Sequence, residues 1–171
     1  MLILINGLVM GGTYAILAVG FALIFGVARI LNFAHTGFYL VGTYLLFTFF
    51  HEWGISLPIS IIAAILITGI LGLICYMLFL ERIKEHAIPV MIVTIALALL
   101  FQEIVMAKYS GIYRSVPPFA IEVTEIGGVA VSYQQLIVIG ICFAIVGDVW
   151  TFLSKSKLGN AIRAISQDRE T

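Results

Sequence analysis

The sequence predicts an all-α, polytopic integral membrane protein, and three observations support this fold class. Of the 171 residues, 62% are hydrophobic and only 11% are charged, whereas an ordinary globular domain carries about 25% charged residues. So few charges cannot cover a water-exposed surface. Five apolar stretches are also long enough to span a membrane, because a helix needs about 20 residues at 1.5 Å each to cross a hydrocarbon core of about 30 Å.

The five predicted membrane spans follow these apolar stretches in order. They lie at residues 2–28, 33–50, 57–80, 88–107 and 133–153. Polar breaks at 51–54 and 81–86 separate the second, third and fourth spans. The only long connection is the loop at 108–132, whose polarity alternates around Gly127-Gly128. This alternation predicts a short β-hairpin.

The basic residues predict the orientation of these spans. Two of the nine lie on one side of the predicted membrane, and these are Lys108 and Arg114. The other seven lie on the opposite side, and these are Arg29, Arg82, Lys84, Lys155, Lys157, Arg163 and Arg169. The more basic side is cytoplasmic by the positive-inside tendency. We therefore expect an external N-terminus, an external loop at 108–132 and a multi-pass protein in a cytoplasmic membrane.

The last residues predict a short amphipathic helix that spans nothing. Leu158, Ala161, Ile162 and Ile165 fall on one helical face, and Ser156 is placed to cap its start. Such a helix lies along the inner surface or docks its apolar face on another protein. The predicted organisation is therefore a transmembrane helical domain at 1–153 followed by a cytoplasmic segment at 154–171.

Small residues form a stripe along the first span at spacings of four, four, three, four and four. They are Gly7, Gly11, Ala15, Ala18, Ala22 and Gly26. Helices in lipid associate through close backbone contact over small residues, because no hydrophobic force drives them together. We interpret the stripe as a helix-packing surface, although a chain with 16 glycines also produces such spacing by chance.

Three polar residues within or beside the spans are candidates for the substrate pathway: Asn32, His35 and Glu103. Polar groups at membrane depth are costly and usually face a cavity or a partner helix. Asn32 and His35 either line a translocation route or cap and pack the second helix near the inner surface. Glu103 is either a functional carboxylate in the fourth span or an interfacial side chain that reaches the outer water.

No catalytic motif is found, so the sequence predicts a protein that is not an enzyme and needs no metal or cofactor. His35, His51 and His86 fall at different membrane boundaries and cannot form one metal site. Cys75 and Cys142 lie in apolar runs and are interpreted as small buried hydrophobic residues. A net charge of zero gives no reason to expect nucleic-acid binding.

Two stretches carry a resemblance to a known family. The first begins at Asn6 and reads NGLVMGGTYAILAVGFALIFGVARILNFAHTGFYLVGTY, and the second begins at Leu158 and reads LGNAIRAISQDRE. They resemble the permease subunits of bacterial branched-chain amino-acid ABC transporters of the high-affinity type. The chain departs from the usual family pattern after His35, where Thr36 precedes Gly37. Because family members continue through further spans, the chain resembles the N-terminal portion of a permease.

The resemblance implies a subunit of an ABC importer that moves branched-chain amino acids across the bacterial inner membrane. Its implied partners are a second permease subunit, cytoplasmic ATPase subunits that hydrolyse the ATP, an external substrate-binding protein and membrane lipid. The tail then becomes the coupling segment that docks in the ATPase, with Gly159, Arg163, Ala164 and Asp168 in matching places. Two alternatives remain: a related permease for urea or short amides, and a channel or structural membrane component without ATPase coupling.

Overall fold

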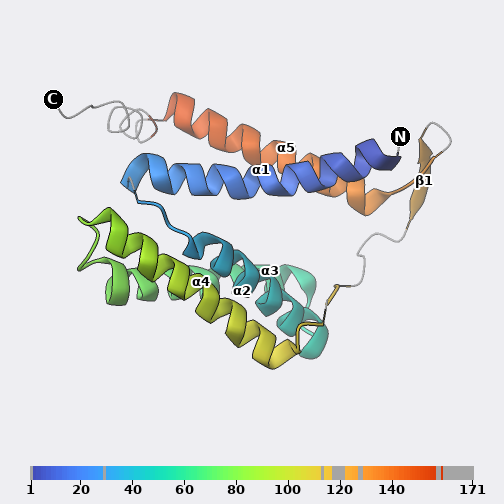
Figure 1. Ribbon diagram of the computed structural model, residues 1–171. Coiled ribbons are helices and arrows are strands. Elements are labelled where there is room, and N and C mark those ends of the chain that lie inside the picture. Colours follow the sequence, from blue (N-terminus) through green and yellow to red (C-terminus); the bar gives the residue numbers. More distant parts are fainter. Residues whose placement is uncertain are drawn as a thin grey trace. The chain divides into compact units, whose positions relative to one another are not determined.

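The computed structural model describes residues 2–28, 30–112, 114–116, 122–126, 129–156 and 159. The chain forms two compact units. The first contains residues 1–29 and 117–171, and the second contains residues 30–116 (Figure 1).

The described part of the first unit contains two long helices and a hairpin. Helix α1 (Leu2–Ala28) packs beside α5 (Tyr133–Lys155), and strands β1 (Val123–Ile126) and β2 (Val129–Ser132) immediately precede α5. The strands pair antiparallel, so the hairpin predicted around Gly127-Gly128 is confirmed. Asn6 contacts Gln135, and a Cβ atom at Gly12 would meet Cys142. From the first contact to the second, the residue number rises in both helices, so α1 and α5 run in the same direction.

A capping box fixes where α5 begins. The Ser132 hydroxyl accepts a hydrogen bond from the Gln134 backbone N–H at 3.2 Å. In return, the Gln135 side-chain oxygen accepts one from the Ser132 backbone N–H at 3.3 Å. This reciprocal pair satisfies N–H groups that have no partner inside the helix. The junction between β2 and α5 is therefore specified by local polar residues.

The second unit consists of three helices, two of which end in a π-helical turn. Helix α2 (Ala34–Phe47) continues into η1 (Thr48–Glu52), α3 (Leu57–Cys75) continues into η2 (Tyr76–Leu80), and α4 spans Ala87–Tyr109. Helix α2 packs against both α3 and α4. The buried core of the unit contains Ala34, Cys75, Leu80, Val90, Leu97 and Phe101.

Helices α2 and α4 approach each other closely at Gly37. A Cβ atom there would lie 3.0 Å from Phe101 Cδ2 and 3.1 Å from Ala98 Cα. The Phe38 and Phe101 rings pack at 5.1 Å, and Tyr44 packs on Tyr109 at 4.7 Å further along both helices. Helices α2 and α4 therefore also run in the same direction.

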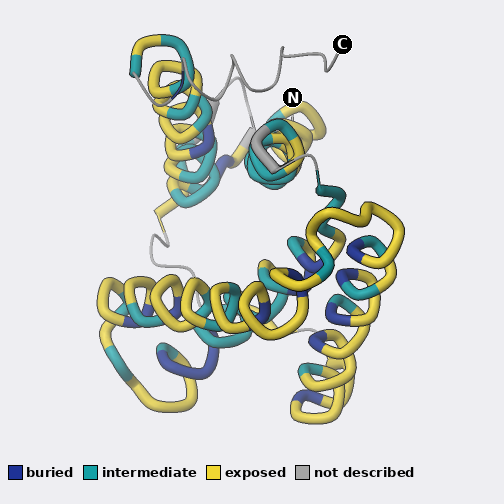
Figure 2. The backbone as a smooth tube through the Cα atoms, turned by 90° about the vertical axis from the view of Figure 1, so that its left-hand side faces the viewer, coloured by how far each residue is buried: buried dark blue, intermediate teal, exposed yellow. Residues whose placement is uncertain are grey.

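The outer surfaces of the helices are apolar, as expected for contact with lipid. On α3, the large side chains of Ile62, Ile65 and Ile70 are more than half exposed, whereas Ser60 and Ala64 are buried. Figure 2 shows the buried residues as short, scattered segments among exposed and partly buried ones. This distribution is the reverse of a soluble fold, in which large apolar patches are rarely exposed.

The five helices expected as membrane spans form where the sequence predicts them, each end lying within two residues of the expected position. The short helix predicted after Ser156 lies, apart from Gly159, outside the described residues. Among the described residues, four helical segments are long and apolar enough to cross a membrane: Ile3–Gly26, Leu57–Leu80, Ala87–Tyr109 and Tyr133–Lys155. The remaining helix, α2 with η1, has 14 α-helical and five π-helical residues and includes His35, His51 and Glu52. The polytopic all-α prediction is confirmed, and the count of five spans stays a prediction.

Candidate functional site

Asn32 organises the turn that leads into α2. Its side-chain oxygen accepts a hydrogen bond from the Ala34 backbone N–H at 3.1 Å, and its carbonyl accepts one from the His35 N–H at 3.3 Å. The Thr94 hydroxyl of α4 donates to the neighbouring Leu31 carbonyl at 3.4 Å. Ala34 and Thr94 are both buried. Asn32 therefore serves the backbone of its own turn, which α4 contacts.

His35 leaves a polar atom buried at the same turn. Its Nε2 is buried and has no hydrogen-bond partner among the described residues. An unsatisfied buried polar group costs about 1–3 kcal/mol. The imidazole Nε2 can therefore form a hydrogen bond, as donor or acceptor, with a group that binds beside it. Such a group is a water molecule, another helix or a transported molecule.

Glu103 does not join this turn. Its residue is exposed on α4, and the carboxylate that pairs with nearby Lys108 is a different one, Glu52, at 3.5 Å. The Lys108 ammonium also lies 4.9 Å from the centre of the Tyr109 ring. The Tyr109 hydroxyl hydrogen-bonds the Thr48 hydroxyl of η1. This polar and aromatic cluster ties the end of α4 to the end of the α2–η1 helix.

The small-residue stripe on α1 follows a groove against α5 for part of its length. Gly7, Gly11 and Ala15 line this groove, together with Cys142 and other residues of α5. A Cβ atom at Gly7, Gly11 or Gly26 would meet no atom of the described residues within 4 Å. Gly7, Gly11, Ala18 and Ala22 are exposed, and Ala15 and Gly26 are partly buried.

The tight contact on α1 lies at Gly12, beside the predicted stripe. A Cβ atom there would lie 2.9 Å from Cys142 Cβ. Spacing alone did not single out Gly12, because it falls one residue away from the repeating positions. The adjacent glycines at 11 and 12 are the sequence feature that indicates a close contact here, but they do not indicate which of the two faces the partner helix.

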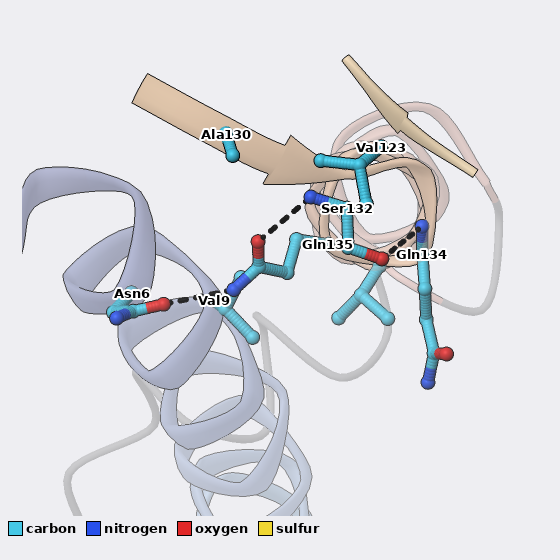
Figure 3. Close-up of a pocket in the computed structure, with 8 residues that line it drawn as sticks. Asn6, Val9, Val123, Ala130, Ser132, Gln134 and Gln135 are labelled. Carbon is cyan, nitrogen blue, oxygen red and sulfur yellow. Dashed lines mark hydrogen bonds between the residues drawn. The ribbon is translucent and has the colours of Figure 1, made fainter. Parts of the chain in front are cut away.

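A second polar site, which the sequence pattern did not predict, lies at the start of α1 and α5. The Gln135 side-chain N–H donates to the Asn6 side-chain oxygen at 2.8 Å. This pair borders a cavity of about 470 Å³ (Figure 3). The lining residues are Asn6, Val9, Val123, Ala130, Ser132, Gln134, Gln135 and Val138. Uncharged polar residues near the ends of two apolar helices were the only sequence signal.

Gly159 is the one predicted coupling residue that the structure describes, because Arg163, Ala164 and Asp168 lie outside the described residues. Its N–H donates to the Ser156 hydroxyl at 2.8 Å. A Cβ atom at Gly159 would lie 2.5 Å from the Leu153 carbonyl oxygen and 2.6 Å from that of Phe152. Only glycine therefore fits against the end of α5.

Within the described part of the chain, no three His, Cys, Asp or Glu residues gather in a group that could hold a metal ion.

These features define a multi-pass helical membrane protein whose polar groups gather where its helices begin and end. The chain belongs to the family of branched-chain amino acid transport system permease components, whose family model matches residues 3–171. The predicted resemblance is thereby confirmed.

Relatives of known role match along nearly all of the chain. It is 29% identical over 180 residues to the high-affinity branched-chain amino acid transport system permease protein BraD of Pseudomonas aeruginosa, covering 96% of this chain and 58% of BraD. It is 23% identical over 177 residues to the corresponding LivH proteins of Salmonella typhimurium and Escherichia coli, covering 95% of this chain and 58% of each relative. The chain thus spans less than two thirds of the length of these relatives. No solved structure matches the chain significantly.

Proposed function

We propose that this chain is part of a permease subunit of an ABC importer for branched-chain amino acids in a bacterial inner membrane. The observation that carries the proposal is the family match over residues 3–171 in a chain with four described helices that are long and apolar enough to span a membrane. The proposed partners are a second permease subunit, cytoplasmic ATPase subunits and an external substrate-binding protein. The ATPase subunits hydrolyse the ATP, and this chain contributes the transmembrane path.

The parallel pairing of α1 and α5 supports a topology with five crossings. Two helices that cross the membrane in the same direction have an odd number of membrane crossings between them along the chain. Three helices lie between α1 and α5 in the chain, so the less apolar α2 crosses as well. At 1.5 Å per residue its α and π segments reach about 28 Å, close to the thickness of the hydrocarbon core.

The basic residues support an external N-terminus for this topology. Cysteine substitutions in a functional permease test the orientation with a membrane-impermeant thiol reagent. We expect Ser115→Cys to react from outside the cell and Ser156→Cys to react only after the membrane is opened. The reverse pattern contradicts the orientation.

We propose different roles for the two polar residues at the start of α2. The hydrogen bond from the Asn32 side chain to its own turn supports a structural role. The buried Nε2 of His35, which has no hydrogen-bond partner in the described part of the chain, supports a role in the substrate pathway, because ionisable groups within spans commonly serve transport. Glu103 is a weaker candidate for the pathway because it is exposed on α4.

The tail is proposed to couple ATP hydrolysis to transport. Amphipathic helices commonly dock an apolar face in a groove of a partner. The close fit of Gly159 against the end of α5 supports a direct mechanical link between this segment and a membrane span. In the complete transporter, Arg163→Ala is expected to leave membrane insertion intact and to lower uptake per ATP hydrolysed. Equal coupling in the two proteins contradicts this role.

Reconstitution in proteoliposomes tests the whole proposal. The permease, its ATPase and a loaded binding protein are expected to import leucine, isoleucine and valine only when ATP is present. Import of urea or short amides instead supports the related permease. Substrate flux without ATP or an ATPase supports a channel.

A further inference from the structure

We propose that the cavity between the start of α1, the hairpin and the start of α5 is a binding subsite for a branched-chain amino acid. This inference rests on the proposed function. With about 470 Å³ of space, the cavity falls in the range of about 300–1,000 Å³ typical of small-molecule sites. All of the residues that line it belong to the first structural unit.

The polar side of the cavity suits the amino and carboxylate groups of a free amino acid. Asn6 and Gln135 are primary amides, which carry four side-chain N–H groups between them. Their mutual hydrogen bond uses one of the four. The remaining N–H groups can donate to a carboxylate, and the amide oxygens can accept from an ammonium group. Gln134 adds a third amide to the lining.

The orientation of Gln135 is set before any ligand arrives. Its oxygen accepts from the Ser132 N–H in the capping box, while its nitrogen donates to Asn6 (Figure 3). Two hydrogen bonds therefore fix which end of the amide faces α1. A donor held in place in this way binds a ligand with less loss of side-chain freedom.

The rest of the lining suits an aliphatic side chain. Val9 of α1 and Val138 of α5 contribute to the wall, and Val123 and Ala130 of the hairpin add further apolar surface. A ligand with a polar head and a branched aliphatic tail matches both parts of this lining.

Among the described residues, no charged side chain lines the cavity, and this suits a transport pathway. A fixed charge would hold a zwitterion or its counter-ion strongly, whereas neutral amides give weaker contacts. Conduction requires binding that is favourable enough to admit the solute and weak enough to release it. The site is therefore better suited to passing an amino acid onward than to storing it.

The experiment compares transport of isoleucine and valine, which differ by one methylene group. The assembled transporter is reconstituted, and each amino acid is supplied on saturating, preloaded binding protein, so that selection by the binding protein does not enter the rate. Val138→Phe narrows the cavity and is expected to lower the isoleucine-to-valine ratio of turnover about tenfold, near the lower end of what one methylene contributes in an apolar pocket. Val138→Ala widens the cavity and is expected to raise the ratio.

Val146→Phe is the matched control, because Val146 lies on the same helix but lines the separate groove against the α1 glycines. Its ratio is expected to stay at the wild-type value. Val9→Phe narrows the cavity from α1 and serves as a second variant should Val138→Phe fail to assemble.

The outcomes separate the two proposals. No import of either amino acid by the wild-type transporter overturns the proposed function. Import by the wild type with an unchanged ratio in every assembled Val138 and Val9 variant overturns the binding site alone. A loss of total import with the same ratio also overturns it, because that result assigns Val138 and Val9 a purely structural role.

Discussion

Replacing Gly37 by alanine tests how closely α2 and α4 must approach. The added Cβ atom would lie 3.1 Å from Ala98 Cα, where ordinary contact begins near 3.4 Å. That neighbour is a backbone atom and cannot rotate away, so α4 must shift by a few tenths of an ångström. The ring of Phe101 must also move, although it already packs on Phe38.

The expected net cost is about 1–2 kcal/mol. Overpacking costs about 1–3 kcal/mol, and a contact with a backbone atom falls in the upper part of that range, at about 2–3 kcal/mol. The preference of alanine over glycine in a helix returns about 1 kcal/mol at most. For a chain of this size, each kcal/mol shifts Tm by about 2–4 °C. We therefore expect the Tm of the purified Gly37→Ala protein in detergent to fall by about 2–8 °C.

The assay is the fraction of monodisperse protein that remains after heating, measured by size-exclusion chromatography. Gly69→Ala on α3 is the matched control, because a Cβ atom there meets nothing within 4 Å. Its Tm should be unchanged or higher. An equal shift in both variants, or a rise in Tm for Gly37→Ala, would refute the close contact between α2 and α4.

Three further substitutions test other contacts. Gly159→Ala should reduce co-purification of the ATPase several-fold because its side chain meets backbone atoms, whereas Gly147→Ala, in open space, should not. His35→Leu should preserve the folded yield, because Nε2 has no partner among the described residues, and should lower uptake at least tenfold. Gln135→Leu should lower the free energy of unfolding by about 1 kcal/mol for the lost cap and by about 0.6 kcal/mol for the lost interhelical hydrogen bond. The measurement is a lower Tm. Gln134→Leu keeps the backbone donor of the cap and should be milder.

Each of these expectations has a clear contrary result. Unchanged ATPase recovery with Gly159→Ala removes the support for a rigid link to α5. Normal uptake by His35→Leu excludes the imidazole from the pathway, and a loss of folded protein instead favours a packing role. Equal Tm values for the Gln135 and Gln134 variants contradict the importance of the capping box.

The sequence by itself determined where the helices and the hairpin form. A run of about 20 apolar residues is a local property, and so is a pair of glycines between alternating residues. The helices at 2–28 and 57–80, and the turn between 126 and 129, could therefore be located without knowledge of any partner. Family membership was also readable, because its motifs are continuous stretches of the chain.

Only the tertiary structure decided which face of each helix meets another helix. In lipid, the surfaces that face other helices and those that face the membrane are both apolar, so periodicity does not distinguish them. This is why Gly12 makes the close contact on α1 although the stripe predicted Gly7 and Gly11. The bond between Asn6 and Gln135 joins residues 129 positions apart, and a pairing at that distance follows from the direction in which α1 and α5 run past each other.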